Sequence, residues 1–195
     1  MIPVVLGLGS NKFFKGLSPI ELLGRSCVFL HDLFFSCSQK STLFSSVYRT
    51  KAMYVTDQSD FFNMAAMGFV NDSFKPGDLL SGIHKIESAL GRDRRHEIRY
   101  GPRSMDIDIE LFGKLNVDEP NLKIPHPRLY ERAFVLIPIL EILPKSADFI
   151  DREIFAEKLR RLPEQGVELY MPFAKFLTEY FPEAADGYKQ EFKLG

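Results

Sequence analysis

Alternating acidic and apolar residues near the middle of the chain are suited to binding a metal ion. Asp106 and Asp108 lie two positions apart in the segment 105–111, in which apolar residues occupy the odd positions. Because successive side chains of a strand point to opposite faces, both carboxylates project from one face, about 7 Å apart at the Cα atoms. Magnesium typically takes one or two protein carboxylates and completes its shell with water and phosphate oxygens. The spacing predicts a magnesium site, although a solvated sheet face carrying acids fits it equally well.

A cluster of arginines precedes these acids: Arg92, Arg94, Arg95, Arg99 and Arg103. Guanidinium groups match phosphate oxygens, and a cationic loop beside a magnesium site suits a polyphosphate. We expect the cluster as a whole to bind a ligand, and Arg95 alone to be a solvated surface residue. Gly101-Pro102 turns the loop into the strand and brings Arg103 next to the acids.

Two histidines and one glutamate give weaker signals. His84 and Glu87 lie three positions apart on the flank of a predicted helix, an arrangement that is usually only a surface pair. His126 is held between two prolines in a rigid segment. It could contact a phosphate or be a structural histidine, and the sequence favours neither.

A polar amide interrupts the apolar run 61–70. Asn63 needs hydrogen-bond partners if it is buried there. A flat heterocycle stacked on an aromatic ring would satisfy it. By default, however, Phe61 and Phe134 are expected to be core residues.

The elements that must position these residues follow the order β-α-β-β-α-β. Runs of apolar, β-branched and aromatic residues predict strands, and helical spacing with capping signals predicts helices. This is the order of a ferredoxin-like α/β sandwich, an antiparallel sheet with both helices on one face, in the α+β class. Strands are expected at 4–8, 42–49, 61–70 and 105–111, helices at 19–33 and 76–90, and extra C-terminal helices at 129–143 (with Pro138 as a possible break), 152–162 and 173–181.

Composition and charge limit the possible classes of protein. The 195 residues, 45% of them hydrophobic, suit a compact domain with an ordinary core. A net charge of −1 argues against general nucleic-acid binding. The N-terminus lacks a secretory signal pattern, no apolar run approaches the ~20 residues of a membrane span, and Cys27 and Cys37 match no metal-binding spacing. We therefore expect a cytoplasmic monomer with free thiols and no nucleic-acid or membrane partner.

Short motifs in a fixed order over residues 2–150 carry a family resemblance. The most specific is Tyr100 to Gly113, YGPRSMDIDIELFG, which is close to the pattern G-P-R-[ST]-x-D-[IL]-D. With it occur LGSN at 8–11, YRT at 48–50, FFN at 61–63, IE at 86–87, GR at 91–92, IPHP at 124–127 and RAFV at 132–135. In these motifs the chain resembles the 6-hydroxymethyl-7,8-dihydropterin pyrophosphokinases of folate biosynthesis.

The resemblance implies an activity and a set of roles. Pyrophosphate would pass from ATP to the hydroxymethyl group of the reduced pterin, releasing AMP, with two Mg²⁺ ions held by Asp106 and Asp108. It also implies a pterin pyrophosphokinase domain over 1–151, with 152–195 as a helical extension packed on it. The implied site residues are Arg92, Arg103, Asp106 and Asp108 for catalysis; His84, Glu87, Arg94, Tyr100, Ile109, His126 and Arg132 for ATP; and Thr50, Met53, Phe61, Asn63 and Phe134 for the pterin.

The chain departs from the family pattern in three places. Many members have tryptophan where this chain has Tyr100, and proline is common where it has Lys51. The arginine loop is one residue longer, so either Arg94 or Arg95 takes the second arginine role.

Two other classes of protein share parts of this pattern. An RNA-binding module has the same element order, but it would carry paired aromatic residues where Ile107 and Ile109 flank acids here. Another magnesium-dependent diphosphokinase or a nucleotidyltransferase would use the same paired acids. Only the acceptor residues Phe61, Asn63 and Phe134 separate that class from the pterin enzyme.

Overall fold

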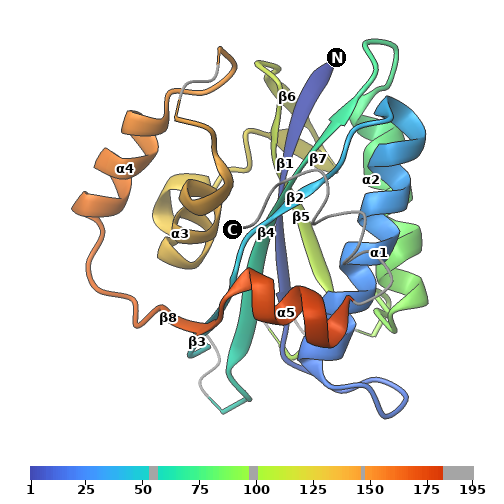
Figure 1. Ribbon diagram of the computed structural model, residues 1–195, viewed down its shortest axis with the longest axis vertical. Coiled ribbons are helices and arrows are strands. Elements are labelled where there is room, and N and C mark those ends of the chain that lie inside the picture. Colours follow the sequence, from blue (N-terminus) through green and yellow to red (C-terminus); the bar gives the residue numbers. More distant parts are fainter. Residues whose placement is uncertain (53–56, 97–100, 146–147, 182–195) are drawn as a thin grey trace.

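The computed structural model describes residues 1–52, 57–96, 101–145 and 148–181 of the chain. Figure 1 shows a twisted sheet with helices packed against it. The elements are β1 (Ile2–Ser10), α1 (Pro19–Ser38), β2 (Leu43–Phe44), β3 (Val47–Thr50), β4 (Phe61–Val70), α2 (Pro76–Ala89), β5 (Asp106–Phe112), β6 (Val117–Glu119), β7 (Leu122–Ile124), a 3₁₀ turn (Leu129–Glu131), α3 (Ala133–Ile142), α4 (Arg152–Arg161), β8 (Glu168–Met171) and α5 (Phe173–Tyr180).

The main sheet is antiparallel and has the strand order β5-β1-β4-β3-β8, with β2 also paired to β4. A separate hairpin pairs β6 with β7. The four predicted strands thus meet in the ferredoxin-like order, the last strand beside the first. The predicted α+β class and ferredoxin-like arrangement are confirmed.

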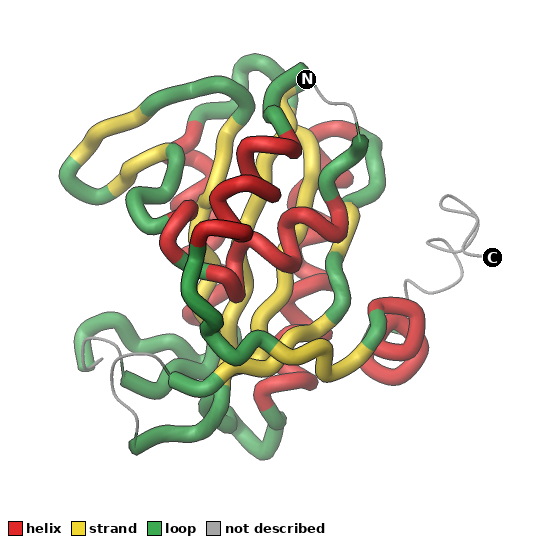
Figure 2. Tube along the Cα trace, turned by 90° about the vertical axis from the view of Figure 1, so that its left-hand side faces the viewer, coloured by secondary structure: helices red, strands yellow, loops and turns green. Residues whose placement is uncertain are grey.

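The sheet separates two apolar layers. α1 and α2 bury their apolar faces on one side, and α3 covers the other with α4 packed against it, so that helices lie in front of and behind the strands in Figure 2. Neighbouring residues of β1 point into different layers. Val4 belongs to the apolar cluster that contains Leu23 and Ile83, and Val5 belongs to the cluster on the other side, with Leu136. This is the alternation expected of a strand buried on both faces.

Local chemistry explains where several elements begin and end. α1 starts at a capping box, in which the Ser18 hydroxyl accepts from the Glu21 N–H and the Glu21 carboxylate accepts from the Ser18 N–H. The helix continues beyond residue 33 because Phe34, one turn after the buried Leu30, is also fully buried in the core. The predicted strand 42–49 is split into β2 and β3 at Ser45 and Ser46. The Ser45 hydroxyl accepts from the N–H of Ala65 in β4, and the Ser46 hydroxyl donates to Glu141 of α3.

The C-terminal part contains one element that the sequence pattern did not predict. The expected helices are present as α4 and α5, but β8 lies between them and pairs with β3 at the edge of the sheet. α3 runs through Pro138 without a break. Among the described residues, no helix is long and apolar enough to cross a membrane.

Candidate active site

The two aspartates of β5 lie beside glycines of β1. Asp106 pairs with Gly9, and Asp108 pairs with Gly7. Directly opposed residues of an antiparallel pair project from the same face, so neither glycine places a side chain of its own beside the aspartate; the Glu110 carboxyl takes the space over Gly7, and a pocket remains beside the two acids. The predicted one-face arrangement of the acids is therefore combined with room for a ligand.

A β-bulge follows directly after the aspartates. Leu6 pairs with Ile109 and Val5 with Leu111, which leaves Glu110 as an extra residue of β5. The bulge shifts the alternation, so that Ile109 packs in the α1–α2 layer and Leu111 in the α3–α4 layer. The expectation that these two residues share a face is wrong for this reason.

The acids line a pocket between the sheet and the start of α3, with about 770 Å³ of space not filled by atoms, part of it open to solvent. The pocket joins two groups of predicted site residues: the acceptor residues Thr50, Phe61, Asn63 and Phe134, and the charged residues Arg103, Asp106, Asp108 and Arg132.

Asn63 is buried, as its need for partners requires. Its Nδ2 donates to the Thr50 hydroxyl over 3.0 Å, so two residues predicted to hold the same ligand hold each other. Phe61 comes from β4 and Phe134 from the first turn of α3, and both line the pocket; Phe134 also packs against the core between the sheet and α3. The predicted residues Met53 and Tyr100 lie outside the described residues.

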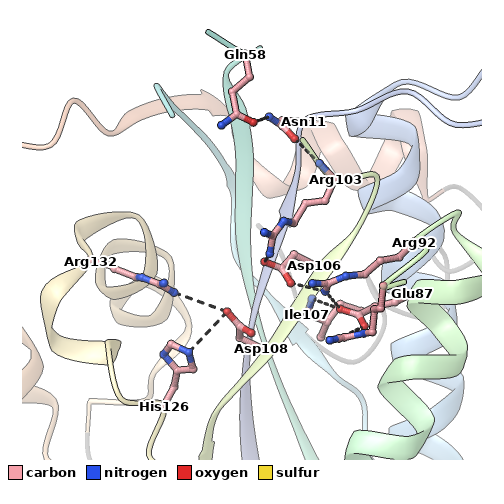
Figure 3. A network of polar contacts seen from close by, with 11 residues as sticks. Asn11, Gln58, Glu87, Arg92, Arg103, Asp106, Ile107, Asp108, His126 and Arg132 are labelled. Atoms are coloured by element: carbon pink, nitrogen blue, oxygen red, sulfur yellow. Dashed lines mark hydrogen bonds and ion pairs between the residues drawn. The ribbon is translucent and has the colours of Figure 1, made fainter. Parts of the chain in front are cut away.

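Arginines hold Asp106 from two directions (Figure 3). Arg103 donates to Asp106 Oδ2 over 2.7 Å, and Arg92 donates to Oδ1. Burial acts to raise the pKa of Asp106, but the two guanidinium charges outweigh it and the pKa is lowered. Asn11 fixes the Arg103 backbone, accepting from its N–H over 2.8 Å and donating to its carbonyl over 3.0 Å.

Glu87 is buried beneath the arginine loop, so the expectation of a surface pair with His84 is wrong for Glu87. Its carboxylate binds Arg92 and Arg94, and it accepts the Ile107 N–H over 2.9 Å. Gly91 allows this return of the chain, since its φ of +91° is a left-handed conformation that follows α2 directly. Arg94 thus faces the site, whereas Arg95 is 86% exposed.

His84 lies at the surface near this cluster. The partial burial of its ring and the charge of Arg94 lower its pKa. Ile109 contributes differently from the other predicted ATP residues. Its side chain is packed in the core, so it can reach a ligand only through main-chain atoms.

Asp108 faces the other side of the site. Arg132 Nη1 lies 3.7 Å and His126 Nε2 4.0 Å from its Oδ2 (Figure 3). Burial and the charge of Asp106 nevertheless raise the pKa of Asp108 to about 7. Burial and Arg132 lower the pKa of His126 to about 4, and its Nδ1 accepts from the Arg128 N–H over 3.2 Å. A neutral His126 with this contact carries its proton on Nε2, toward Asp108.

Glu110 is a pocket residue that the sequence pattern did not single out. Its side chain is fully buried, and neither carboxyl oxygen has a hydrogen-bond partner in the described part of the chain. Burial and the neighbouring Asp108 raise its pKa well above the usual range. The carboxyl lies over Gly7, where an added Cβ would be 2.9 Å from Oε1. An acid two positions after D-x-D looks like a third solvated residue, because the bulge leaves no mark in the sequence.

The donor set fits a magnesium ion that also binds phosphate. Two carboxylates match the one or two protein ligands that Mg²⁺ takes in such sites. The Asp108 oxygens lie 3.7 Å or more from their cationic neighbours, whereas Asp106 would exchange an arginine contact for the ion. A concentration of buried negative charge, with the pKa of Asp108 raised, also favours a bound cation. Within the described ranges no group of three or more His, Cys, Asp or Glu residues is arranged for metal binding. Water and substrate oxygens usually complete the shell of a Mg²⁺ ion held by one or two carboxylates.

Comparisons with known proteins agree on one family. The family model described as 7,8-dihydro-6-hydroxymethylpterin-pyrophosphokinase (HPPK) matches residues 5–144. The 2-amino-4-hydroxy-6-hydroxymethyldihydropteridine pyrophosphokinase of Bacillus subtilis is 46% identical over 101 residues, which cover 52% of this chain and 58% of that protein. A folate synthesis bifunctional protein of Arabidopsis thaliana is 42% identical over 140 residues, 72% of this chain and 27% of that protein.

A solved structure of HPPK-DHPS from Plasmodium falciparum has a TM-score of 0.54 at 14% identity, covering 80% of this chain and 43% of that one. At this identity the likeness concerns the fold alone. The chain thus spans little more than half of the Bacillus protein and about a quarter of the Arabidopsis one.

Proposed function

Because the chain belongs to the 7,8-dihydro-6-hydroxymethylpterin-pyrophosphokinase family, we propose that it transfers pyrophosphate from ATP to 6-hydroxymethyl-7,8-dihydropterin. The products are the pterin diphosphate and AMP, and the step belongs to folate biosynthesis. One observation carries the proposal: a single pocket joins an aromatic and amide acceptor site to paired acids and arginines.

The acceptor half of the pocket suits a flat, polar heterocycle. Phe61 and Phe134 offer rings to its two faces, and stacked aromatic contacts are each worth about 0.5–1.5 kcal/mol beyond the area buried. Asn63 and Thr50 lie at its polar edge, already oriented by the hydrogen bond between them.

The charged half of the pocket suits a triphosphate. Arg92, Arg103 and Arg132 surround the aspartates. A guanidinium group can donate two parallel hydrogen bonds to the oxygens of one phosphate group, which makes arginine well suited to bind a triphosphate. Neutral His126 can donate from Nε2 to the same ligand. Two Mg²⁺ ions held by Asp106 and Asp108, when bound, would neutralise the bridging oxygens and the charge that shifts to the leaving AMP.

The residues act mainly by positioning. The acceptor hydroxyl, fixed by the heterocycle site, attacks the β-phosphorus of ATP in line with the departing AMP oxygen. Phosphoryl-type transfer needs little proton abstraction before the transition state, so no side chain has to act as a strong base. Arginines already bound to Asp106 and Glu87 are preorganised for the charge that develops.

The wider setting is also a proposal. We infer a cytoplasmic monomer acting on small molecules, with no nucleic-acid partner, from the near-neutral charge and ordinary composition. We further infer that residues 152–195 pack on the catalytic domain of 1–151. The pairing of β8 with β3 and the contact of α4 with α3 support this for the described part of the extension.

The test is an assay of the purified protein with ATP, Mg²⁺ and 6-hydroxymethyl-7,8-dihydropterin, with nucleotides separated by chromatography. AMP should appear in step with pterin diphosphate, and only when the pterin is present. Release of ADP would indicate transfer of a single phosphoryl group, and release of free pyrophosphate a nucleotidyltransferase. Either result would reject the proposal.

A further inference from the structure

Gln165 reaches from the C-terminal part of the chain to the start of α3. Its Oε1 accepts from the Ala133 N–H over 2.8 Å, and its Nε2 donates to the Glu131 carbonyl over 3.0 Å. The two contacts bracket Arg132, so one side-chain amide fixes the backbone on both sides of that residue. Gln165 lies 21 positions beyond residue 144, where the family match ends.

The bracketed segment carries two pocket residues. Arg132 directs its guanidinium toward Asp108 and over the Phe134 ring, 5.6 Å from its centroid. Arg132 is also the N-cap of α3, and it makes no side-chain capping bond in the described structure. Gln165 therefore acts as a helix cap from a distant part of the chain: its Oε1 accepts a hydrogen bond from the first N–H of α3, which has no partner within the helix.

The loop that carries Gln165 also connects to the opposite wall of the pocket. In Figure 1 the chain leaves α4, passes α3 and enters β8 beside β3. Glu168 of β8 lies opposite Arg49 of β3 in the sheet, and the two side chains form an ion pair of 2.7 Å. Arg49 directly precedes the pocket residue Thr50 in the sequence. A second hollow lined by Thr50, Lys51 and Gln165 lies between the two attachment points.

We propose that Gln165 is a positioning residue for the acceptor: it holds the start of α3 so that Phe134 faces the heterocycle bound by Asn63 and Thr50. The inference rests on the proposed function. In the proposed complex ATP contacts several other side chains, including Arg92, Arg103 and His126. The acceptor ring contacts fewer side chains, so the position of each one matters more for its binding. Loss of Gln165 should therefore affect the acceptor more than the nucleotide.

The test compares steady-state kinetics of the full-length wild type with Gln165→Ala and Gln165→Glu. Gln165→Ala should raise the KM for 6-hydroxymethyl-7,8-dihydropterin by about three- to tenfold, the range expected for loss of a helix cap, with a smaller change in the KM for ATP. Gln165→Glu keeps an acceptor for Ala133 but sets an oxygen against the Glu131 carbonyl. It should also raise the pterin KM, and it keeps the test decisive if the alanine variant fails to fold.

Glu164→Ala is the matched control, because Glu164 is an exposed neighbour in the same loop and should leave both KM values unchanged. Equal changes in both KM values, or none in the pterin KM, would overturn the role of Gln165 while leaving the proposed function intact. A wild type that releases no AMP would reject both.

Discussion

The buried carboxylate of Glu87 accepts a hydrogen bond from the backbone N–H of Ile107, the residue between the two candidate metal-binding aspartates. The same carboxylate binds Arg92 and Arg94. One side chain at the end of α2 thus couples the position of β5 to that of the arginine loop. We interpret Glu87 as a residue that positions the ATP site, since its oxygens are already used by protein groups.

Changing Glu87 should separate these functions. Glu87→Gln can still accept from Ile107 but loses both ion pairs, so the KM for ATP should rise about tenfold or more while the pterin KM changes less. Glu87→Ala leaves Arg92 buried without this partner and should lower the free energy of unfolding by about 3 kcal/mol. Urea unfolding and steady-state kinetics test both variants. Unchanged ATP kinetics in Glu87→Gln would show that the arginines are placed without it.

The paired aspartates should be essential for turnover and dispensable for folding. Asp106→Ala and Asp108→Ala should each lower kcat on the order of 10²–10³-fold or more, since each removes a preorganised charge at the transferred group. Chelation of Mg²⁺ should abolish AMP release, and added Mg²⁺ should restore it. Circular dichroism provides the control for folding. Substantial activity in both variants would remove metal binding by these residues from the mechanism.

The raised pKa of Asp108 predicts how stability without metal depends on pH. The folded-state pKa is about 7 against an ordinary 3.8, so between these values the folded protein holds a proton that the unfolded chain has released. The free energy of unfolding then falls as pH rises across this window. Asp108→Asn removes this effect and should be more stable than the metal-free wild type at pH 8, with the difference shrinking toward pH 4. Each 1 kcal/mol should shift Tm by about 2–4 °C. A difference independent of pH would contradict the raised pKa.

The elements with strong local signals were predictable from the sequence. The capping box at Ser18 and Glu21, the apolar run 61–70 and the glycine after α2 each depend on neighbouring residues, and each has the expected structural consequence. The D-x-D pair was also placed correctly on one face, opposite the two glycines of β1.

Features that depend on distant pairing were not predictable. β8 is an edge strand that exists through its ladder with β3, and its own sequence carries little alternation. The bulge at Glu110 appears only when β5 is set against β1. The burial of Glu87 likewise depends on the return of the arginine loop, so its helical flank alone suggested a surface residue.

Glu110 and Gly7 should be energetically coupled, because the carboxyl occupies the space that a Gly7 side chain would need. Gly7→Ala should lower the free energy of unfolding by about 1–3 kcal/mol, the usual cost of overpacking, and by less in a Glu110→Ala background. Glu110→Met keeps the length of the side chain and removes a buried carboxyl that has no hydrogen bond in the described structure and lies 3.8 Å from His126 Nδ1, so it should raise that free energy by about 1–3 kcal/mol. Urea unfolding of the four proteins of the cycle, and of Glu110→Met, measures both effects. Additive single effects would show that the two side chains do not share this space, and a destabilised Glu110→Met would show that the carboxyl has a favourable partner in the folded protein.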